Sequence, residues 1–265
     1  MSEPLLLVEP RGQASRLLAS LEAERLRSES DVRDALERHR RRAIWVAPNA
    51  PAIRLLVAAL AGRSRGDQRL LSLEPANGAR HGLLHAIFRF VVSADEGVSL
   101  LPTDELADVL GSPHREDLFV GAAIATDDAA VVLYRGSLDP LVVPLAWFRV
   151  RHGGPRADPS RLSVSDFGQT VRLGDYQAAT DAVLYEFDDA YRRRAKKRQI
   201  QQDRSFGGAL RRLRLQNGLY RTDFPGVTAK EIARIERGEV KKPHPRTLAA
   251  VAKRLGVRPE SIASF

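Results

Sequence analysis

Short apolar runs alternate with helical patterns of apolar and polar positions in the N-terminal part of the chain. Apolar runs of strand length occupy residues 5–8, 43–46 and 68–73. Apolar positions recur at helical spacing over residues 14–40, and a second helical pattern begins at Asn49 and continues through Leu60. Alternating strands and helices are typical of an α/β arrangement, which we expect for residues 1–112.

The middle of the chain, residues 113–190, predicts a smaller α+β domain. A helix that starts near Pro102 and ends at Gly111 precedes it. Strands are predicted by the apolar runs 118–124, 130–135 and 141–148. Two further strands, 164–167 and 170–173, flank Gly168-Gln169, which is a hairpin signal.

A long helical pattern over residues 175–202 crosses an abrupt change of charge. Its apolar stripe consists of Tyr176, Ala179, Val183, Phe187 and Tyr191. The acidic pair Asp188-Asp189 gives way to the basic cluster Arg192, Arg193, Arg194, Lys196, Lys197 and Arg198. We interpret the pattern as one helix that leads through a basic linker, residues 191–204, to the last domain. The cluster either contacts phosphate groups or forms a solvated linker face.

Residues 205–265 predict three short amphipathic helices. The first carries Phe206, Leu210 and Leu213 on one face. Three basic residues lie off that stripe: Arg211, Arg212 and Arg214. The third has an inward face made of Leu248, Val251, Ala252 and Leu255. It ends at Gly256, and Pro259 suits the first turn of a short last helix that carries Ile262.

The second of these helices has the clearest signals at both ends. Thr228, followed three residues later by Glu231, is a capping box, in which each side chain reaches the backbone amide of the other residue. Ile232 and Ile235 give the helix an inward face, and Gly238 provides a left-handed stop.

The distribution of charge separates the two ends of the chain. From Tyr191 onward there are 20 Lys and Arg against 6 Asp and Glu, a net charge of +14. The preceding residues hold the other 22 basic and 27 acidic residues, a net charge of −5. A genome rich in arginine codons would enrich both parts alike. The asymmetry therefore indicates a polyanionic partner for the C-terminal end.

Composition and motifs exclude several kinds of chemistry. The chain has no cysteine, so disulfides and thiol nucleophiles are excluded. It contains no phosphate-binding glycine loop, no dinucleotide fingerprint and no nucleophile elbow. We expect no enzymatic activity, no catalytic residue and no cofactor. The lack of a membrane-length apolar run and of a basic signal-peptide start predicts a protein of the bacterial cytoplasm, with no membrane partner.

Weaker candidates for chemistry have simpler explanations. His81 and His85 could share a metal on a helix, but no third ligand is apparent nearby. The acidic pair Asp127-Asp128 is typical of a solvated turn. The opening Leu-Leu-Leu-Val-Glu-Pro superficially resembles a response-regulator receiver domain, yet Glu9 stands alone beside Pro10 and no phosphoacceptor is supported. No metal site is expected.

The C-terminal segment resembles the phage-repressor (Cro/cI, or XRE) class of helix-turn-helix DNA-binding domains. The resemblance is carried by Leu210-Arg211-Arg212-Leu213-Arg214, by Ile232-Ala233-Arg234-Ile235-Glu236-Arg237-Gly238, by Lys241-Lys242-Pro243 and by Leu248 through Val257. Members usually place a full helix between the first helix and the recognition helix. Here Pro225 and Gly226 resist helix formation, so we expect that helix to be one turn, with Phe224 plugging the core.

Three motifs stand out in residues 113–190: Leu133-Tyr134-Arg135-Gly136, the run Val142-Val143-Pro144-Leu145-Ala146-Trp147-Phe148, and Asp166 through Val171. With these motifs the segment resembles a small bacterial α+β family known only as a domain of unknown function. This resemblance implies a fold and no chemistry. The expected fold class is therefore α+β, with an α/β-like N-terminal body and a C-terminal all-α helix-turn-helix domain.

The helix-turn-helix resemblance implies a sequence-specific regulator that binds double-stranded DNA. The positions that would read bases are Ala229, Lys230, Ala233 and Arg234. The positions that would contact phosphate are Arg211, Thr228, Arg237, Lys241 and Lys242. One such helix reads few base pairs, so we expect a homodimer on a two-fold-related operator.

Three other functions stay open at this point. An antitoxin-like or partner-binding protein could use the same domain to regulate its own operon. An RNA-binding or non-specific architectural protein would also be basic at one end. An enzyme acting through the N-terminal body is the third.

Overall fold

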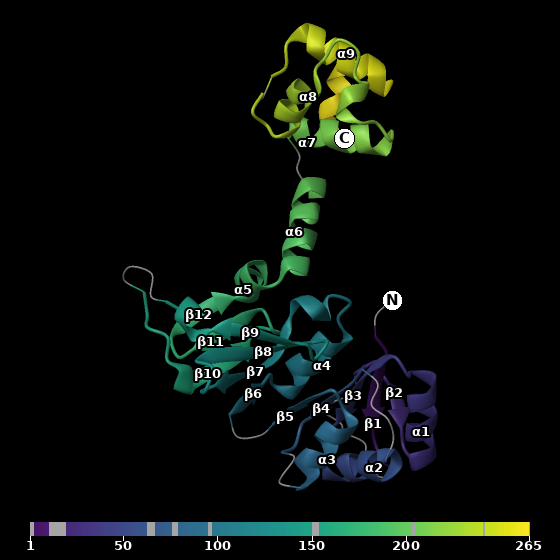
Figure 1. The fold of residues 1–265 in the computed structure, drawn as a ribbon, viewed down its shortest axis with the longest axis vertical. Coiled ribbons are helices and arrows are strands. Elements are labelled where there is room, and N and C mark those ends of the chain that lie inside the picture. Colours follow the sequence, from purple (N-terminus) through teal and green to yellow (C-terminus); the bar gives the residue numbers. More distant parts are fainter. Residues whose placement is uncertain are drawn as a thin grey trace. The chain divides into compact units, whose positions relative to one another are not determined.

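The computed structural model describes residues 3–10, 20–62, 67–75, 79–94, 97–149, 154–202, 205–240 and 242–264. The chain is a mixed α+β protein (Figure 1). It divides into two compact units, Met1–Asp188 and Asp189–Phe265.

A five-stranded parallel sheet forms the first part of the N-terminal unit. The strand order is β2-β1-β3-β4-β5, and every pairing is parallel. The strands are β1 (Leu5–Val8), β2 (Glu24–Leu26), β3 (Arg42–Ala47), β4 (Asp67–Ser72) and β5 (Phe90–Ser93). The helices are α1 (Glu29–Arg38), α2 (Ala50–Leu60) and α3 (Ala79–Ile87). This order is one of the common doubly wound arrangements, so the predicted α/β character of this part is confirmed.

The predicted single helix over residues 14–40 is wrong. Residues 11–19 lie outside the described residues, but Glu24–Leu26 form β2, and α1 begins only at Glu29. Ser28 caps α1 by accepting from the Asp31 amide, which fixes the start of the helix. Residues 24–26 instead pair with β1, where Leu6 lies opposite Glu24. Pairing across the sheet therefore overrides the helical spacing of the apolar residues.

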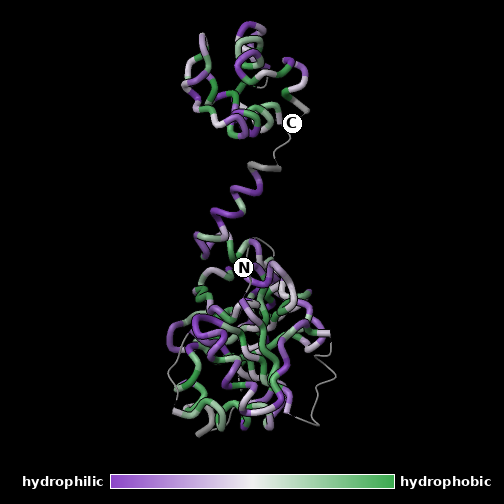
Figure 2. The backbone as a smooth tube through the Cα atoms, turned by 90° about the vertical axis from the view of Figure 1, so that its right-hand side faces the viewer, coloured by the Kyte–Doolittle hydropathy of each residue, from purple (hydrophilic) through white to green (hydrophobic). Residues whose placement is uncertain are grey.

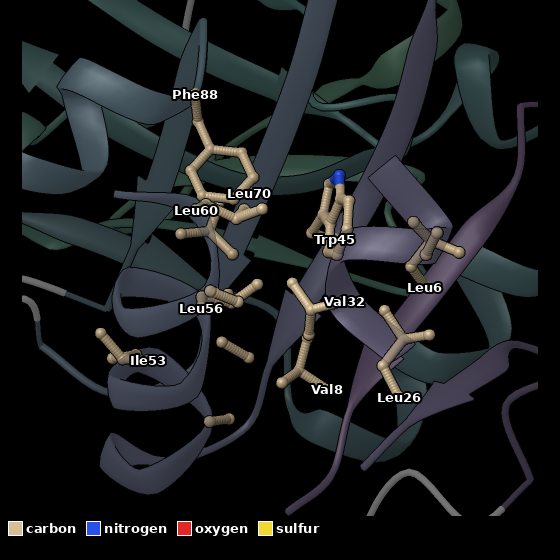
Figure 3. Close-up of a cluster of buried hydrophobic side chains, with 14 of the residues drawn as sticks. Leu6, Val8, Leu26, Val32, Trp45, Ile53, Leu56, Leu60, Leu70 and Phe88 are labelled. Carbon is tan, nitrogen blue, oxygen red and sulfur yellow. The ribbon is translucent and has the colours of Figure 1, made fainter. Parts of the chain in front are cut away.

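One apolar cluster fills the space between this sheet and its helices (Figure 3). It combines Trp45 of β3 with Val32 of α1 and Leu56 of α2, all fully buried. The Trp45 indole Nε1 donates to Gln68 Oε1 at 2.7 Å, so its polar atom is satisfied inside the core. Phe88 packs edge-on against the Trp45 ring, with the ring centroids 6.1 Å apart.

Two antiparallel sheets complete the N-terminal unit. The four-stranded sheet has the order β6-β7-β8-β9, from β6 (Val98–Leu100), β7 (Phe119–Ala125), β8 (Ala130–Arg135) and β9 (Pro140–Pro144). The three-stranded sheet contains β10 (Leu162–Ser165), β11 (Thr170–Leu173) and β12 (Tyr176–Ala179). The predicted hairpin around Gly168 is confirmed as β10 and β11. Gly168 has φ +78°, and its carbonyl accepts from the Phe119 amide at 3.1 Å.

The predicted strand over residues 141–148 stops early. β9 ends at Pro144, and Leu145–Trp147 form a short 3-10 turn, η3. Proline has no amide proton and is tolerated on edge strands, which is where the strand order places β9.

The predicted domain boundary at 112/113 differs from the observed arrangement. The helix α4 (Thr103–Gly111) is confirmed, but β6 lies before the boundary and pairs with β7 after it. Asp139 accepts from both Arg42 and Arg69 at 2.6 Å, which joins residues of the parallel sheet to a loop next to β9. Burial raises the pKa of Glu3, whose carboxylate also pairs with Arg42. Residues 1–188 therefore form one compact unit in the structure.

The predicted continuous helix over residues 175–202 is also wrong. Tyr176–Ala179 form β12, paired with β11, and two helices follow, α5 (Thr180–Phe187) and α6 (Asp189–Gln202). Asp188 separates them in an extended conformation, and its Oδ2 accepts from Arg135 Nη1 at 2.8 Å. In Figure 2, α6 is drawn mostly in the purple of hydrophilic residues.

The C-terminal unit confirms the three predicted amphipathic helices. They are α7 (Phe206–Gln216), α8 (Ala229–Glu236) and α9 (Pro245–Leu255). The 3-10 segment η5 (Arg221–Asp223) lies between α7 and α8, and a second 3-10 segment, η6 (Pro259–Ser264), follows α9. Gly256 ends α9 with φ +69°, and Ile262 is fully buried. The predicted one-turn connection is confirmed, since η5 is the only helical segment described between α7 and α8. Phe224 is 2% exposed and fills the core as predicted.

Candidate nucleic-acid interface

The ends of α8 are fixed by local sequence. The Thr228 hydroxyl accepts from the Glu231 amide at 3.1 Å, which is half of the predicted capping box. The Glu231 carboxylate does not return to Thr228. It accepts from the Thr247 hydroxyl at 2.9 Å and ties α8 to α9. At the other end Gly238 adopts φ +74°, and the Glu239 amide donates to the Arg234 carbonyl at 3.0 Å.

The faces of α8 differ sharply in chemistry. Ile232 and Ile235 are buried in the core of the unit. Lys230 and Arg234, one turn apart, are exposed on the other side of the helix. Ala229 and Ala233 are half-buried beside them. The four residues predicted to read bases therefore form one accessible strip along the helix.

A buried ion pair, not predicted from the sequence, fixes α8 against α7. Arg214 Nε donates to Glu236 Oε1 at 2.6 Å, and their side chains are 8% and 1% exposed. Arg214 also donates to the Leu219 carbonyl at 2.8 Å. Arg221 of η5 reaches Glu236 Oε2 at 2.8 Å. The expectation that Arg214 lies off the buried face is wrong. Arg214 stands one turn after Leu210, at the edge of the apolar stripe. This position was the sequence signal that could have predicted its burial.

A glycine allows α7 and α8 to touch through their backbones. A Cβ added to Gly207 would lie 2.2 Å from the Ile235 carbonyl oxygen, which is closer than real atoms approach. Gly207 is buried within the first turn of α7. The position of α8 against α7 therefore depends on the absence of a side chain at residue 207.

The residues predicted to contact phosphate lie in different settings. Thr228, Arg237 and Lys242 are exposed. Arg211 is half-buried, and its Nε has no hydrogen-bond partner among the described residues. Lys241 lies outside the described residues.

An acidic residue just after α8 pairs with two of the candidate DNA-contacting arginines. Arg237 Nε donates to Glu239 Oε1 at 2.6 Å, and Arg234 Nε donates to Glu239 Oε2 at 3.2 Å. The hydrogen bond from Arg237 is the main cause that lowers the pKa of Glu239. Glu239 therefore stays ionised and partly neutralises the basic face of α8.

Within the described ranges, no three His, Cys, Asp or Glu residues are grouped as a metal site would require. The side chain of His81 lies outside the described residues. None of the described helices combines the length and apolar character needed to cross a membrane. No family model, no curated protein and no solved structure matches this chain.

Proposed function

We propose that this protein is a sequence-specific DNA-binding regulator that inserts α8 into the major groove. The observation that carries the proposal is the strip of Lys230 and Arg234 on α8, opposite a face held in the core by Ile232 and Ile235. A helix of this diameter fits the major groove, where base edges are distinguishable. The excess of basic residues in the same unit supports a polyanionic partner.

Base reading is assigned to the middle of α8. Arginine and lysine suit guanine O6 and N7, and an alanine methyl suits a thymine methyl. The Nε of Arg234 already bonds to Glu239, so a guanine contact through its two Nη atoms can leave that bond in place. Arg234 and Lys230 are the proposed main determinants of sequence preference, with Ala229 and Ala233 beside them.

Phosphate contacts would set the orientation of the helix. Thr228 lies at the N-terminus of α8, where helix amides and the helix dipole favour a phosphate group. Arg237, Lys242, Lys241 and Arg211 are the proposed cationic contacts. One helix reads few base pairs, so we propose that two copies bind a two-fold-related site.

Two substitutions separate base reading from phosphate contact. A preferred site is first recovered by selecting bound duplexes from a random pool. We expect Arg234→Ala to reduce the preference for that site over random duplex by about 1–3 kcal/mol, because a base contact is lost. We expect Lys242→Ala to weaken binding to both duplexes alike, because phosphates carry no sequence information.

The control is Arg54→Ala, which removes an exposed arginine from α2 of the other unit. Equilibrium binding to both duplexes is measured at several salt concentrations. An unchanged preference in the Arg234→Ala protein would show that α8 does not read bases through this residue.

Glu239 offers a test with the opposite sign. We expect Glu239→Gln to increase affinity for random duplex, because Arg237 no longer has to leave a carboxylate to reach a phosphate. The decrease of log affinity with log salt concentration should become steeper by about one, since the freed arginine now displaces one more counterion from the DNA. Glu260→Gln removes an equal charge from an exposed site in η6 and is the control. Equal effects of the two substitutions would mean that only net charge matters.

A further inference from the structure

The basic cluster of α6, made of Arg192, Arg193, Arg194, Lys196, Lys197 and Arg198, is unusual for a helix that is to be stable on its own. Like charges stand four residues apart in the pairs Arg192 and Lys196, Arg193 and Lys197, and Arg194 and Arg198. Such pairs repel one another on a helix. A single acidic residue in α6, Asp189, pairs with Arg192 at 3.0 Å.

The position of the cluster along α6 does not offset this cost. Cations stabilise a helix through its dipole only when they stand in the last turn. In α6 the cations occupy the middle of the helix, and the last turn contains no basic residue. A helix arranged only for its own stability would place such cations in its last turn. The charge pattern is therefore better explained by a ligand than by helix formation.

The described side chains of α6 also give it no extended apolar face. At about 100° per residue, the six cations cover about two thirds of the circumference. Tyr191 is buried, with the guanidinium groups of Arg194 and Arg198 over its ring at 5.9 and 5.4 Å. Arg193, Lys196 and Lys197 are exposed on the remaining surface. A helix that lies on a lipid surface needs an apolar face to insert, so the pattern fits a purely ionic ligand better.

We infer that α6 is a second DNA-contacting element, which binds the phosphate backbone of the duplex through Arg193, Lys196 and Lys197. The inference rests on the proposed function of α8, which lies in the same compact unit. Phosphate contacts add affinity without adding sequence information. Repulsion within the cluster would be relieved when the phosphates neutralise it, which couples the stability of α6 to binding.

The test uses the full chain and a random-sequence DNA duplex. The variant Arg193→Gln, Lys196→Gln and Lys197→Gln keeps good helix formers at all three positions. The control variant is Arg54→Gln, Arg149→Gln and Arg156→Gln, three exposed arginines of the other unit, so both variants lose the same net charge. Log affinity decreases linearly with log salt concentration. The steepness of that decrease should be reduced by about 2–3 in the α6 variant, and by less than one in the control. The ratio of affinities for selected and random duplex should stay unchanged in both.

The other outcomes are distinct. If the unaltered protein binds the duplex and the α6 variant keeps its slope, α6 has no role and the inference is overturned, while the function of α8 stands. If the unaltered protein binds no duplex, the proposed function fails and the inference fails with it. Binding to phosphatidylserine vesicles or to an RNA hairpin that is tighter than binding to DNA, and is lost in the α6 variant, would also overturn the inference.

Discussion

Replacing Glu236 with alanine is expected to lower the free energy of unfolding of the C-terminal unit by about 3–5 kcal/mol. The substitution leaves the guanidinium of Arg214, which is 8% exposed, buried without its carboxylate. A unit of this size has a total stability of roughly 4–11 kcal/mol, so a large part of its stability would be lost. The DNA binding that we propose for α8 should be lost with it.

The two units can be followed separately in the intact chain. Both tryptophans, Trp45 and Trp147, lie in Met1–Asp188, so tryptophan fluorescence reports on the N-terminal unit. Far-ultraviolet circular dichroism reports on both units. Denaturant unfolding of the Glu236→Ala protein should show an early dichroism transition, with the fluorescence transition unchanged.

Glu260→Ala makes the same chemical change at an exposed position of η6 and is the control. The double variant Arg214→Met and Glu236→Leu removes both charges and should recover much of the lost stability. If Glu236→Ala and Glu260→Ala unfold at the same denaturant concentration, the ion pair contributes nothing.

Gly207→Ala is expected to destabilise the C-terminal unit by at least about 1–3 kcal/mol, although alanine forms helices more readily than glycine. The new Cβ would lie 2.2 Å from the Ile235 carbonyl oxygen, so α7 and α8 must separate. The measurement is again the dichroism transition, together with binding to the selected duplex, since a displaced α8 would also lose affinity.

Gly82→Ala is the matched control. It lies in α3, and a Cβ there would meet nothing within 4 Å. That substitution should stabilise its own unit by about 0.5–1 kcal/mol, because alanine loses less backbone freedom on folding. A stabilising effect of Gly207→Ala would show that α7 and α8 are not in close backbone contact.

Features that depend on neighbouring residues were predictable from the sequence. Asn49 accepts from the Ala52 amide and starts α2 where expected, and Thr228 and Gly256 mark ends of α8 and α9. The apolar run of β3 is fully buried across residues 43–47. In each case the signal and the structure it specifies lie within a few residues of each other.

Features that depend on distant partners were not predictable. Residues 24–26 have helical spacing but pair with β1, and residues 176–179 pair with β11. Glu231 begins a local capping motif, yet its carboxylate bonds to Thr247. Arg214 and Glu236 are 22 positions apart, and nothing in a single sequence shows that they meet. Within the candidate site, the composition of the exposed strip was predicted, while the interactions that support it were found only in the structure.

The parallel sheet of the N-terminal unit has a consequence for the order in which the protein folds. None of its strands can pair through a tight hairpin, since each parallel pairing requires a long crossover of the chain. The loop between two paired strands must close before their contacts can form, and the entropy lost in closing it slows folding. On refolding from denaturant, we therefore expect Trp45 of β3, which is fully buried, to reach its native environment only after these crossovers have closed.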